Sequence, residues 1–383
     1  MKLRVSLLLV ASLIGAACTS NEPAAPRLAV IDDTGNISLV DAATEDRTRI
    51  TTNAASSLSY FQPVWSPSED LFVYSEATPD GSRLVLVDGN GDFKKRIETP
   101  VSSFFHQWNP QGDRIAFLGN GAAGLEFHVA DVEAGTTTML GTGAPFYFDW
   151  SPEGDRIIAQ VGREELSIRD LDGAVETLDA IPGEMQAPQW TDHGRWYVSD
   201  GRLVLDDDGS TRTIAIADGF ITFAVSGDRV AVQSTTTGQD GTSVAFQPAP
   251  VSLDPGLHVV DIESGETELV NRDPVLGFWW SPDGTRLAYL TLDDLDTVEG
   301  SWHVWDGTGL TTVFPAGRPS LQFFRDLAPF FDQYTRSMTV WSPDGESLVH
   351  PMVLSNLAGI WVLPLSTGEP TQVGDGVWAT WNR

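Results

Sequence analysis

Apolar and polar residues alternate along most of the chain in short runs, and each run ends in a turn sequence. The stretch FWWSPDGTRLAYL (278–290) shows the pattern, with an apolar run up to Trp280, a Ser-Pro-Asp-Gly turn and a second apolar run. Such runs, bounded by Gly, Pro and Asp, predict β-strands joined by tight hairpins. No convincing amphipathic helix separates them, so the pattern predicts an all-β fold.

This phrase recurs along the chain and defines a repeat. A second hairpin pattern follows each full copy, as in RLVLVDGNGDFKKRI (83–97), so each unit contains four predicted strands, A to D. Units of about 40 residues with four strands are typical of propeller blades, because one small sheet cannot bury both faces alone. The anchor positions aligned with Trp280 are Trp65, Trp108, Trp150, Trp190, Val225, Trp280, Trp341 and Trp381.

The two ends of the repeat region predict a closed ring. Residues 27–52 supply strands B, C and D with no A before them, and GVWATWNR (376–383) supplies an A strand with nothing after it. Joined, they complete one blade. Counting A strands gives a single propeller of eight four-stranded blades. Because the copy at Val225 lacks both the Trp and the Pro, seven blades is the alternative.

The repeated phrase itself is interpreted as architecture. The Trp is expected to fill the layer between blades, Ser-Pro to start a tight turn, and Asp-Gly to supply positions that tolerate positive φ. The pattern W-S-P-D-G-x-x-L-A-Y, followed by apolar-x-V-x-D, resembles the TolB-type, WD40-like (PD40) propeller repeat of bacterial envelope proteins, over about residues 27–383. The resemblance implies the fold and not an activity, since such propellers serve as binding platforms, assembly factors and non-catalytic halves of peptidases.

The N-terminus predicts export and lipidation. Lys2 and Arg4 precede a short apolar run and the sequence IGAAC, which ends at Cys18, the only cysteine. This resembles a lipoprotein signal, with Gly15 where Leu is commoner, and an ordinary cleaved signal is the alternative. We expect residues 1–17 to be the signal peptide, 18–26 a flexible tether and 27–383 the propeller domain. The mature chain would be anchored by lipidated Cys18 in the cell envelope, in the periplasm or on the outer face of the membrane.

Charge narrows the choice of partners. The formal net charge is -30, from 53 Asp+Glu against 23 Lys+Arg. So acidic a surface repels nucleic acid and anionic lipid, and we expect no nucleic-acid partner. The charge favours solubility, and we expect a monomer.

Three long insertions break the repeat. In the predicted topology, B–C and D–A loops share one face of the disc, here called the near face. The insertions are the B–C loop from Ser234 to Gly256, the next B–C loop 291–301 and the D–A connection 314–337. They belong to consecutive blades, so we expect a binding site over that sector, since long loops on a rigid scaffold are where binding usually lies.

The third insertion combines aromatic and charged residues. Such a mixture suits a docking surface or a pocket wall. It also suits aromatic side chains that close the hydrophobic end of the central channel, with the charges paired among themselves. The candidate binding residues are Arg325, Asp326, Phe330, Phe331, Asp332, Tyr334 and Arg336, with the aromatic ones as anchors and the arginines as orienting charges.

The sequence contains no convincing catalytic motif, and we expect no cofactor. There is no His spacing of a zinc site, no G-x-S-x-G elbow and no phosphate-binding glycine loop. The weak candidates for a cation are the carboxylates of the loop 291–301, namely Asp293, Asp294, Asp296 and Glu299. Carboxylates at the channel mouth, Asp294, Asp326 and Asp332, would be the candidates for a hydrolase or lyase.

The sequence therefore predicts a lipid-anchored extracytoplasmic binding or scaffold protein that recognises a protein segment or an envelope ligand on the near face. An envelope hydrolase or lyase and a structural subunit of an envelope assembly are the alternatives. Carboxylates that converge in a deep near-face pocket would favour catalysis, and an aromatic rim would favour binding.

Overall fold

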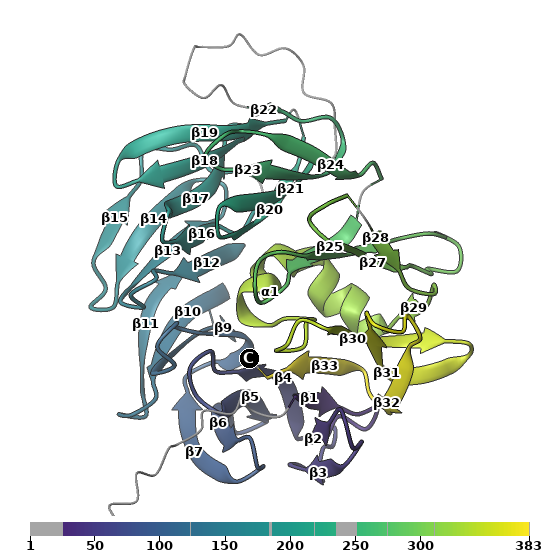
Figure 1. Ribbon diagram of the computed structural model, residues 1–383. Coiled ribbons are helices and arrows are strands. Elements are labelled where there is room, and N and C mark those ends of the chain that lie inside the picture. The colour runs from purple at the N-terminus through teal and green to yellow at the C-terminus, as the bar shows by residue number, and fades with distance from the viewer. Residues whose placement is uncertain are drawn as a thin grey trace, which may run out of the picture.

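The computed structural model describes residues 26–382 apart from 123, 184–185, 218, 235–250, 274 and 310. These residues form eight sheets arranged as the blades of a β-propeller around a short helix, α1 (Figure 1). The eight-bladed prediction is confirmed, and the segment around Val225 forms a complete blade without the Trp or the Pro. The predicted signal peptide 1–17, the predicted lipidation site Cys18 and the predicted tether up to residue 25 lie outside the described residues.

The first strand of each blade lies nearest the centre of the ring, where strands of neighbouring blades and α1 meet. From the centre outwards, the first four blades are β33 (Trp378–Trp381), β1 (Arg27–Ile31), β2 (Ile37–Asp41) and β3 (Arg47–Arg49); β4 (Ser59–Trp65), β5 (Leu71–Thr78), β6 (Gly81–Asp88) and β7 (Phe93–Thr99); β8 (Ser102–Trp108), β9 (Arg114–Gly121), β10 (Gly124–Asp131) and β11 (Thr136–Thr142); β12 (Phe146–Trp150), β13 (Arg156–Val161), β14 (Glu165–Asp170) and β15 (Val175–Thr177). The other four are β16 (Gln189–Thr191), β17 (Gly194–Ser199), β18 (Arg202–Asp207) and β19 (Ser210–Ile216); β20 (Ile221–Ser226), β21 (Arg229–Ser234), β23 (Gly256–Asp261) and β24 (Thr267–Asn271); β25 (Val275–Trp280), β26 (Leu287–Thr291), β27 (Trp302–Trp305) and β28 (Thr311–Val313); β29 (Arg318–Pro319), β30 (Ser347–Leu354), β31 (Leu357–Pro364) and β32 (Thr371–Gly374).

The chain ends close the ring as predicted. β33 pairs antiparallel with β1, with Trp381 opposite Leu28 and Trp378 opposite Ile31. Arg27 N–H donates to the Asn382 side-chain oxygen (2.9 Å), and Asn382 N–H donates to the Arg27 carbonyl (2.9 Å). Head and tail thus share one blade, which removes two open sheet edges.

The anchor tryptophans join neighbouring blades through a repeated hydrogen bond. In four blades the indole Nε1–H donates to the carbonyl just before the anchor position of the preceding blade. The pairs are Trp108 with Val64 (3.0 Å), Trp150 with Gln107 (3.3 Å), Trp280 with Ala224 (2.9 Å) and Trp341 with Trp279 (2.9 Å). The repeated Trp therefore combines inter-blade packing with a directed polar contact.

The turn after the Trp is fixed by its own side chains. In the repeat at 278–290, Ser281 Oγ accepts a hydrogen bond from Arg286 N–H (2.9 Å) and donates one to Asp283 (2.6 Å). Gly284 has φ +69°, where a β-carbon would be strained. The WSPDG phrase is thus a structural element. In the predicted topology its turns lie on the far face of the disc, opposite the near face.

The last blade departs from the prediction. Its innermost strand is split: β29 pairs with β30, the chain then leaves as a short helical segment, and it returns at Trp341, which bridges to Leu348. The segment comprises a π-helical turn (Phe323–Leu327), a 3-10 turn (Ala328–Phe330) and α1 (Phe331–Ser337). The insertion therefore interrupts strand A instead of lying between strands D and A, and the strand-only interpretation missed its helices. A helix this short carries no clear period and depends on tertiary contacts.

The two well-described insertions lie side by side. Gly300, in the loop 291–301, exchanges two backbone hydrogen bonds of 2.9 Å with Gly317, just before β29. The loop predicted from Ser234 to Gly256 lies mostly outside the described residues, and its last part, β22 (Val251–Ser252), pairs parallel with β19 on the outer edge of a blade. No helix in the described ranges is long and apolar enough to cross a membrane.

Candidate functional site

The helical insertion plugs the central channel. Figure 1 shows α1 at the centre of the ring, and it contacts the innermost strands β8, β12, β20 and β25. The Gln333 amide accepts from Phe148 N–H (2.8 Å) and donates to the Phe148 carbonyl (2.8 Å), as a neighbouring strand would. Tyr334 packs edge-on against Phe105 at 5.1 Å between ring centroids. The plug is thus part of the hydrophobic core.

A buried ion pair ties the plug to three blades. Asp149 is 1% exposed and accepts from Arg336 Nε (2.9 Å), Trp190 N–H (3.0 Å) and Gln107 Nε2 (2.6 Å). Its partners come from α1, β16 and β8, while Asp149 itself lies on β12. Arg336 therefore faces the far side of the plug, where it lines a separate depression with Trp280.

Asp332 is a second buried carboxyl on the plug. Its Oδ2 accepts from Ala187 N–H (2.8 Å) and its Oδ1 from Gln333 N–H (3.0 Å). Burial raises the pKa of Asp332 to about 6, against the lowering effect of these two donors. The group belongs to the packing of the plug, since it is buried and does not line the near-face pocket described below.

We expect replacement of Asp332 by Asn to change the pH dependence of stability. The folded-state pKa is raised, so wild type loses stability as pH rises from about 4 through about 6, whereas D332N does not. The free energy of unfolding of D332N minus that of wild type should increase by up to about 3 kcal/mol between about pH 4 and about pH 7.5. Urea titrations at both pH values measure it, and a difference independent of pH would show that Asp332 titrates normally.

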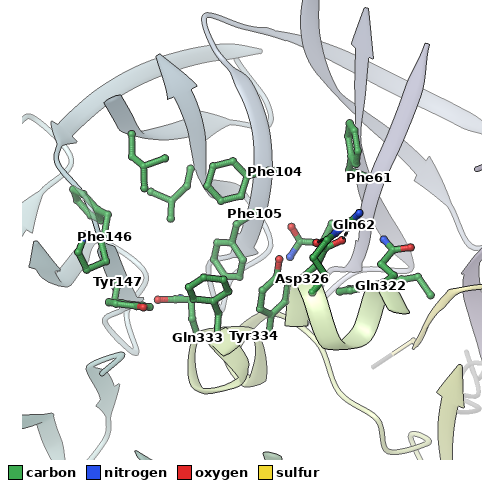
Figure 2. Close-up of a pocket in the computed structure, with 16 residues that line it drawn as sticks. Phe61, Gln62, Phe104, Phe105, Phe146, Tyr147, Gln322, Asp326, Gln333 and Tyr334 are labelled. Atoms are coloured by element: carbon green, nitrogen blue, oxygen red, sulfur yellow. Dashed lines mark hydrogen bonds and ion pairs between the residues drawn. The ribbon is translucent and has the colours of Figure 1, made fainter. Parts of the chain in front are cut away.

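On the near face, the plug and the inner strands of four blades enclose a pocket of about 460 Å³ (Figure 2). Gln333 and Tyr334 of the plug line it, as do residues of the inner strands β4, β8, β12 and β33 and one residue each of β9 and β10. Three aromatic side chains remain partly exposed at the pocket: Phe61 (38%), Phe104 (37%) and Phe330 (39%). Its lining residues are Phe61, Gln62, Phe104, Phe105, Leu118, Leu125, Pro145, Phe146, Tyr147, Gln322, Arg325, Asp326, Phe330, Gln333, Tyr334 and Trp378.

Two β-bulges aim side chains into this pocket. The pairing of β4 with β5 shifts register between Phe61 and Val64, and that of β8 with β9 shifts between Ser103 and Phe105. A bulge re-aims side chains at a strand end and is common beside functional sites. Gln62 lies in the first bulge at φ +43°, a backbone conformation that non-glycine residues rarely adopt.

The Gln62 side chain is held in one orientation. It is 4% exposed, and its Oε1 accepts from His106 N–H (3.1 Å). Its Nε2 therefore points the other way, and no acceptor in the described part of the chain lies within hydrogen-bond distance of it. A buried donor without an acceptor costs about 1–3 kcal/mol, so this amide is a feature that packing alone does not explain.

The pocket carries no net charge of its own. Its one carboxylate, Asp326, accepts hydrogen bonds from both Nε (2.6 Å) and Nη2 (2.7 Å) of Arg325. Burial raises the pKa of Tyr147 and of Tyr334 well above its usual value, so both phenols stay neutral. Burial also lowers the pKa of His106, beside Gln62, to about 4. The site is thus a neutral aromatic cavity with a paired charge at its mouth.

The structure separates the candidate residues into three groups. Arg325, Asp326, Phe330 and Tyr334 line the near-face pocket. Phe331 and Asp332 are buried in the plug, and Phe331 packs against Phe278 and Trp279 of β25. Arg336 faces the far side. The segment thus fits both interpretations of its sequence, since part of it closes the channel and part of it lines a pocket.

The acidic loop 291–301 does not converge into a site. Asp293 accepts from Thr291 Oγ1 (2.6 Å) and Ser301 Oγ (2.5 Å), whereas Asp294 accepts from the N–H groups of Asp296 (2.8 Å) and Thr297 (3.1 Å). These bonds shape the loop itself. Among the described residues, no group of three or more His, Cys, Asp or Glu could hold a metal ion, and this includes Asp293, Asp294, Asp296 and Glu299.

Most of the pocket wall was missed by sequence reasoning. The prediction placed recognition over the blades of Val225, Trp280 and Trp341, but the plug crosses the channel and faces the inner strands on the opposite side. The signal was present as aromatic residues just before three anchor tryptophans, in SYFQPVW (59–65), SSFFHQW (102–108) and FYFDW (146–150). What sequence could not supply is the direction in which the insertion folds.

No family model matches this chain, and no curated protein matches it. Solved structures similar to it include the dihydro-heme d1 dehydrogenase NirN (TM-score 0.59, 10% identity, 92% of this chain and 74% of that chain). A eukaryotic initiation factor is also similar (TM-score 0.54, 15% identity, 93% and 98%), as is TolB from Acinetobacter baumannii (TM-score 0.40, 14% identity, 72% and 74%). At these identities the likeness shows the fold alone: the chain is a β-propeller.

Proposed function

We propose that this protein is a binding protein whose ligand site is the near-face pocket at the mouth of the plugged channel. The observation that carries the proposal is a concave aromatic cavity of about 460 Å³, a size typical of small-ligand sites, built by five segments far apart in sequence. Exposed aromatic side chains gathered in one place favour an interaction site over a bare surface.

The arrangement favours binding over hydrolysis or elimination. A carboxylate mechanism needs two acidic groups across a reacting bond. Of the three candidates, Asp326 lies in the pocket and is paired with Arg325, Asp332 is buried in the plug, and Asp294 shapes the neighbouring loop. The pocket therefore offers apolar contact and uncharged polar groups instead of an acid–base pair.

The proposed setting is the cell envelope. It rests on the sequence pattern before Cys18 and on the resemblance of the repeat to the TolB type. A lipid anchor at Cys18, followed by the tether to residue 26, would hold the propeller at a membrane face with the pocket accessible to ligands.

Binding of N-phenyl-1-naphthylamine, an uncharged aromatic dye that fluoresces in apolar sites, tests the proposal. We expect saturable one-to-one binding, weakened about tenfold by Phe104→Ala, because the variant loses about 1–2 kcal/mol of aromatic contact. Phe93→Ala is the matched control, since Phe93 is 55% exposed on β7 and outside the pocket. Binding that does not saturate, or that both variants weaken equally, would contradict a site in the pocket.

A further inference from the structure

We infer that the ligand of the near-face pocket is an uncharged aromatic molecule with a carbonyl oxygen, and that Gln62 Nε2 donates the hydrogen bond that orients it. This rests on the proposed function and adds the chemical class of the ligand. Three features of the pocket lead to it: its walls, its charge and the buried, unsatisfied donor of Gln62.

The walls select a flat, ring-bearing molecule. Phe61, Phe104 and Phe330 line the pocket from two strands and the plug. The rings of Phe105 and Tyr334, both labelled in Figure 2, meet edge-to-face in the same pocket. Aromatic rings gain most from other rings in offset or edge-on contact, so an aromatic body uses these walls better than a linear chain does. Because the plug closes the channel below, a molecule enters from the near face only.

The charge balance selects a neutral molecule. Arg325 and Asp326 pair with each other through two hydrogen bonds, so the pocket offers a ligand no unpaired charge. The tyrosines of the pocket are neutral, because burial raises the pKa of each well above its usual value. A ligand with a buried charge would lose its hydration without a partner, and such a group is costly.

The free donor selects an acceptor atom on the ligand. Gln62 lines the pocket, and the His106 N–H fixes which end of its amide carries the donor. Since Nε2 has no acceptor among the described residues, a carbonyl oxygen placed there would complete its bonding. Gln62 is 4% exposed and its Nε2 is buried, so this bond requires a small shift of the Gln62 amide toward a ligand seated in the pocket.

A pair of probes that differ only in the carbonyl tests the inference. We expect displacement of N-phenyl-1-naphthylamine from the full chain to show that 9-fluorenone binds about five- to tenfold more tightly than fluorene. Fluorene carries CH₂ in place of C=O. The anion fluorene-9-carboxylate should bind more weakly than either. Gln62→Met should reduce the fluorenone preference to about one while leaving fluorene affinity nearly unchanged. Gln322→Met, a glutamine of the same pocket, is the matched control and should keep the preference.

Each other outcome overturns the inference. Equal binding of fluorene and fluorenone by wild type would show that the pocket does not recognise a carbonyl oxygen. If the carboxylate bound most tightly, the pocket would favour an anionic ligand instead of a neutral one. If Gln62→Met keeps the preference, or Gln322→Met loses it, the donor is not Gln62. Should Gln62→Met fail to fold, Gln62→Glu keeps an acceptor for His106 N–H and should also lose the preference. In all these cases the dye still binds, whereas loss of dye binding by wild type would refute the proposed function itself.

Discussion

Replacing Trp381 by Ala is expected to lower the free energy of unfolding by about 3–5 kcal/mol. The side chain is 2% exposed and packs within the strand that closes the ring, opposite Leu28. Its loss leaves a large cavity at the one blade built from both chain ends. Because that blade holds the first and last segments together, the loss acts on closure as well as on packing.

The midpoint of urea unfolding, compared among wild type, Trp381→Ala and Trp381→Phe, measures the effect. The indole Nε1 of Trp381 has no acceptor among the described residues, so Phe loses volume but no hydrogen bond, and we expect a cost below about 1.5 kcal/mol. A loss of less than about 1 kcal/mol for the Ala variant would mean that the head-to-tail blade does not hold the ring closed.

Asp149→Ala is expected to destabilise the protein by about 3–5 kcal/mol, since it leaves Arg336 and two further donors without their buried acceptor. Asp149 joins the plug to β8 and β16, so its removal should loosen the channel as well as the ion pair. Thermal unfolding and urea titration both report the loss. The double variant Asp149→Ala, Arg336→Met should recover part of it, because it also removes the uncompensated charge.

Asp326→Ala provides the comparison on the same insertion. Asp326 also pairs with an arginine, but its own side chain is 33% exposed, against 2% for Asp149, and Arg325 is 70% exposed, against 26% for Arg336. Exposed ion pairs contribute about 0–1 kcal/mol, so this variant should unfold almost as wild type does. Equal losses for Asp149→Ala and Asp326→Ala would show that burial of the Asp149 pair does not anchor the plug.

The fold was predictable because the repeat carries its own physical reasons. The tryptophan that recurs before Ser-Pro donates to the preceding blade, the serine and glycine shape the turn, and the unpaired strands at the two ends are complementary in number. The blade of Val225 was the least certain part of the prediction, because it lacks both the Trp and the Pro of the repeated phrase, and the structure confirms it as a complete blade. Because the same four-strand unit recurs, one sequence was enough to predict which strands pair within each blade.

The site was predictable only in part. The insertion 314–337 was identified because it breaks the repeat, and Phe330, Arg325 and Asp326 do line a pocket. That the same segment would split a strand, form α1 and cross the channel depends on contacts such as those of Gln333 with Phe148 and of Arg336 with Asp149. Those pairs are more than 180 residues apart, and no local pattern specifies them. Gln62 was missed because its importance lies in a bulge and an unsatisfied amide, which sequence does not show.

The most direct test of the account is to locate a bound ligand by crystallography of the protein with 9-fluorenone. The account predicts the compound on the near face, between Phe104 and Phe330, with its oxygen within hydrogen-bond distance of Gln62 Nε2. Fluorenone found instead at the opposite mouth, beside Trp280 and Arg336, would contradict the claim that the aromatic pocket above the plug is the binding site.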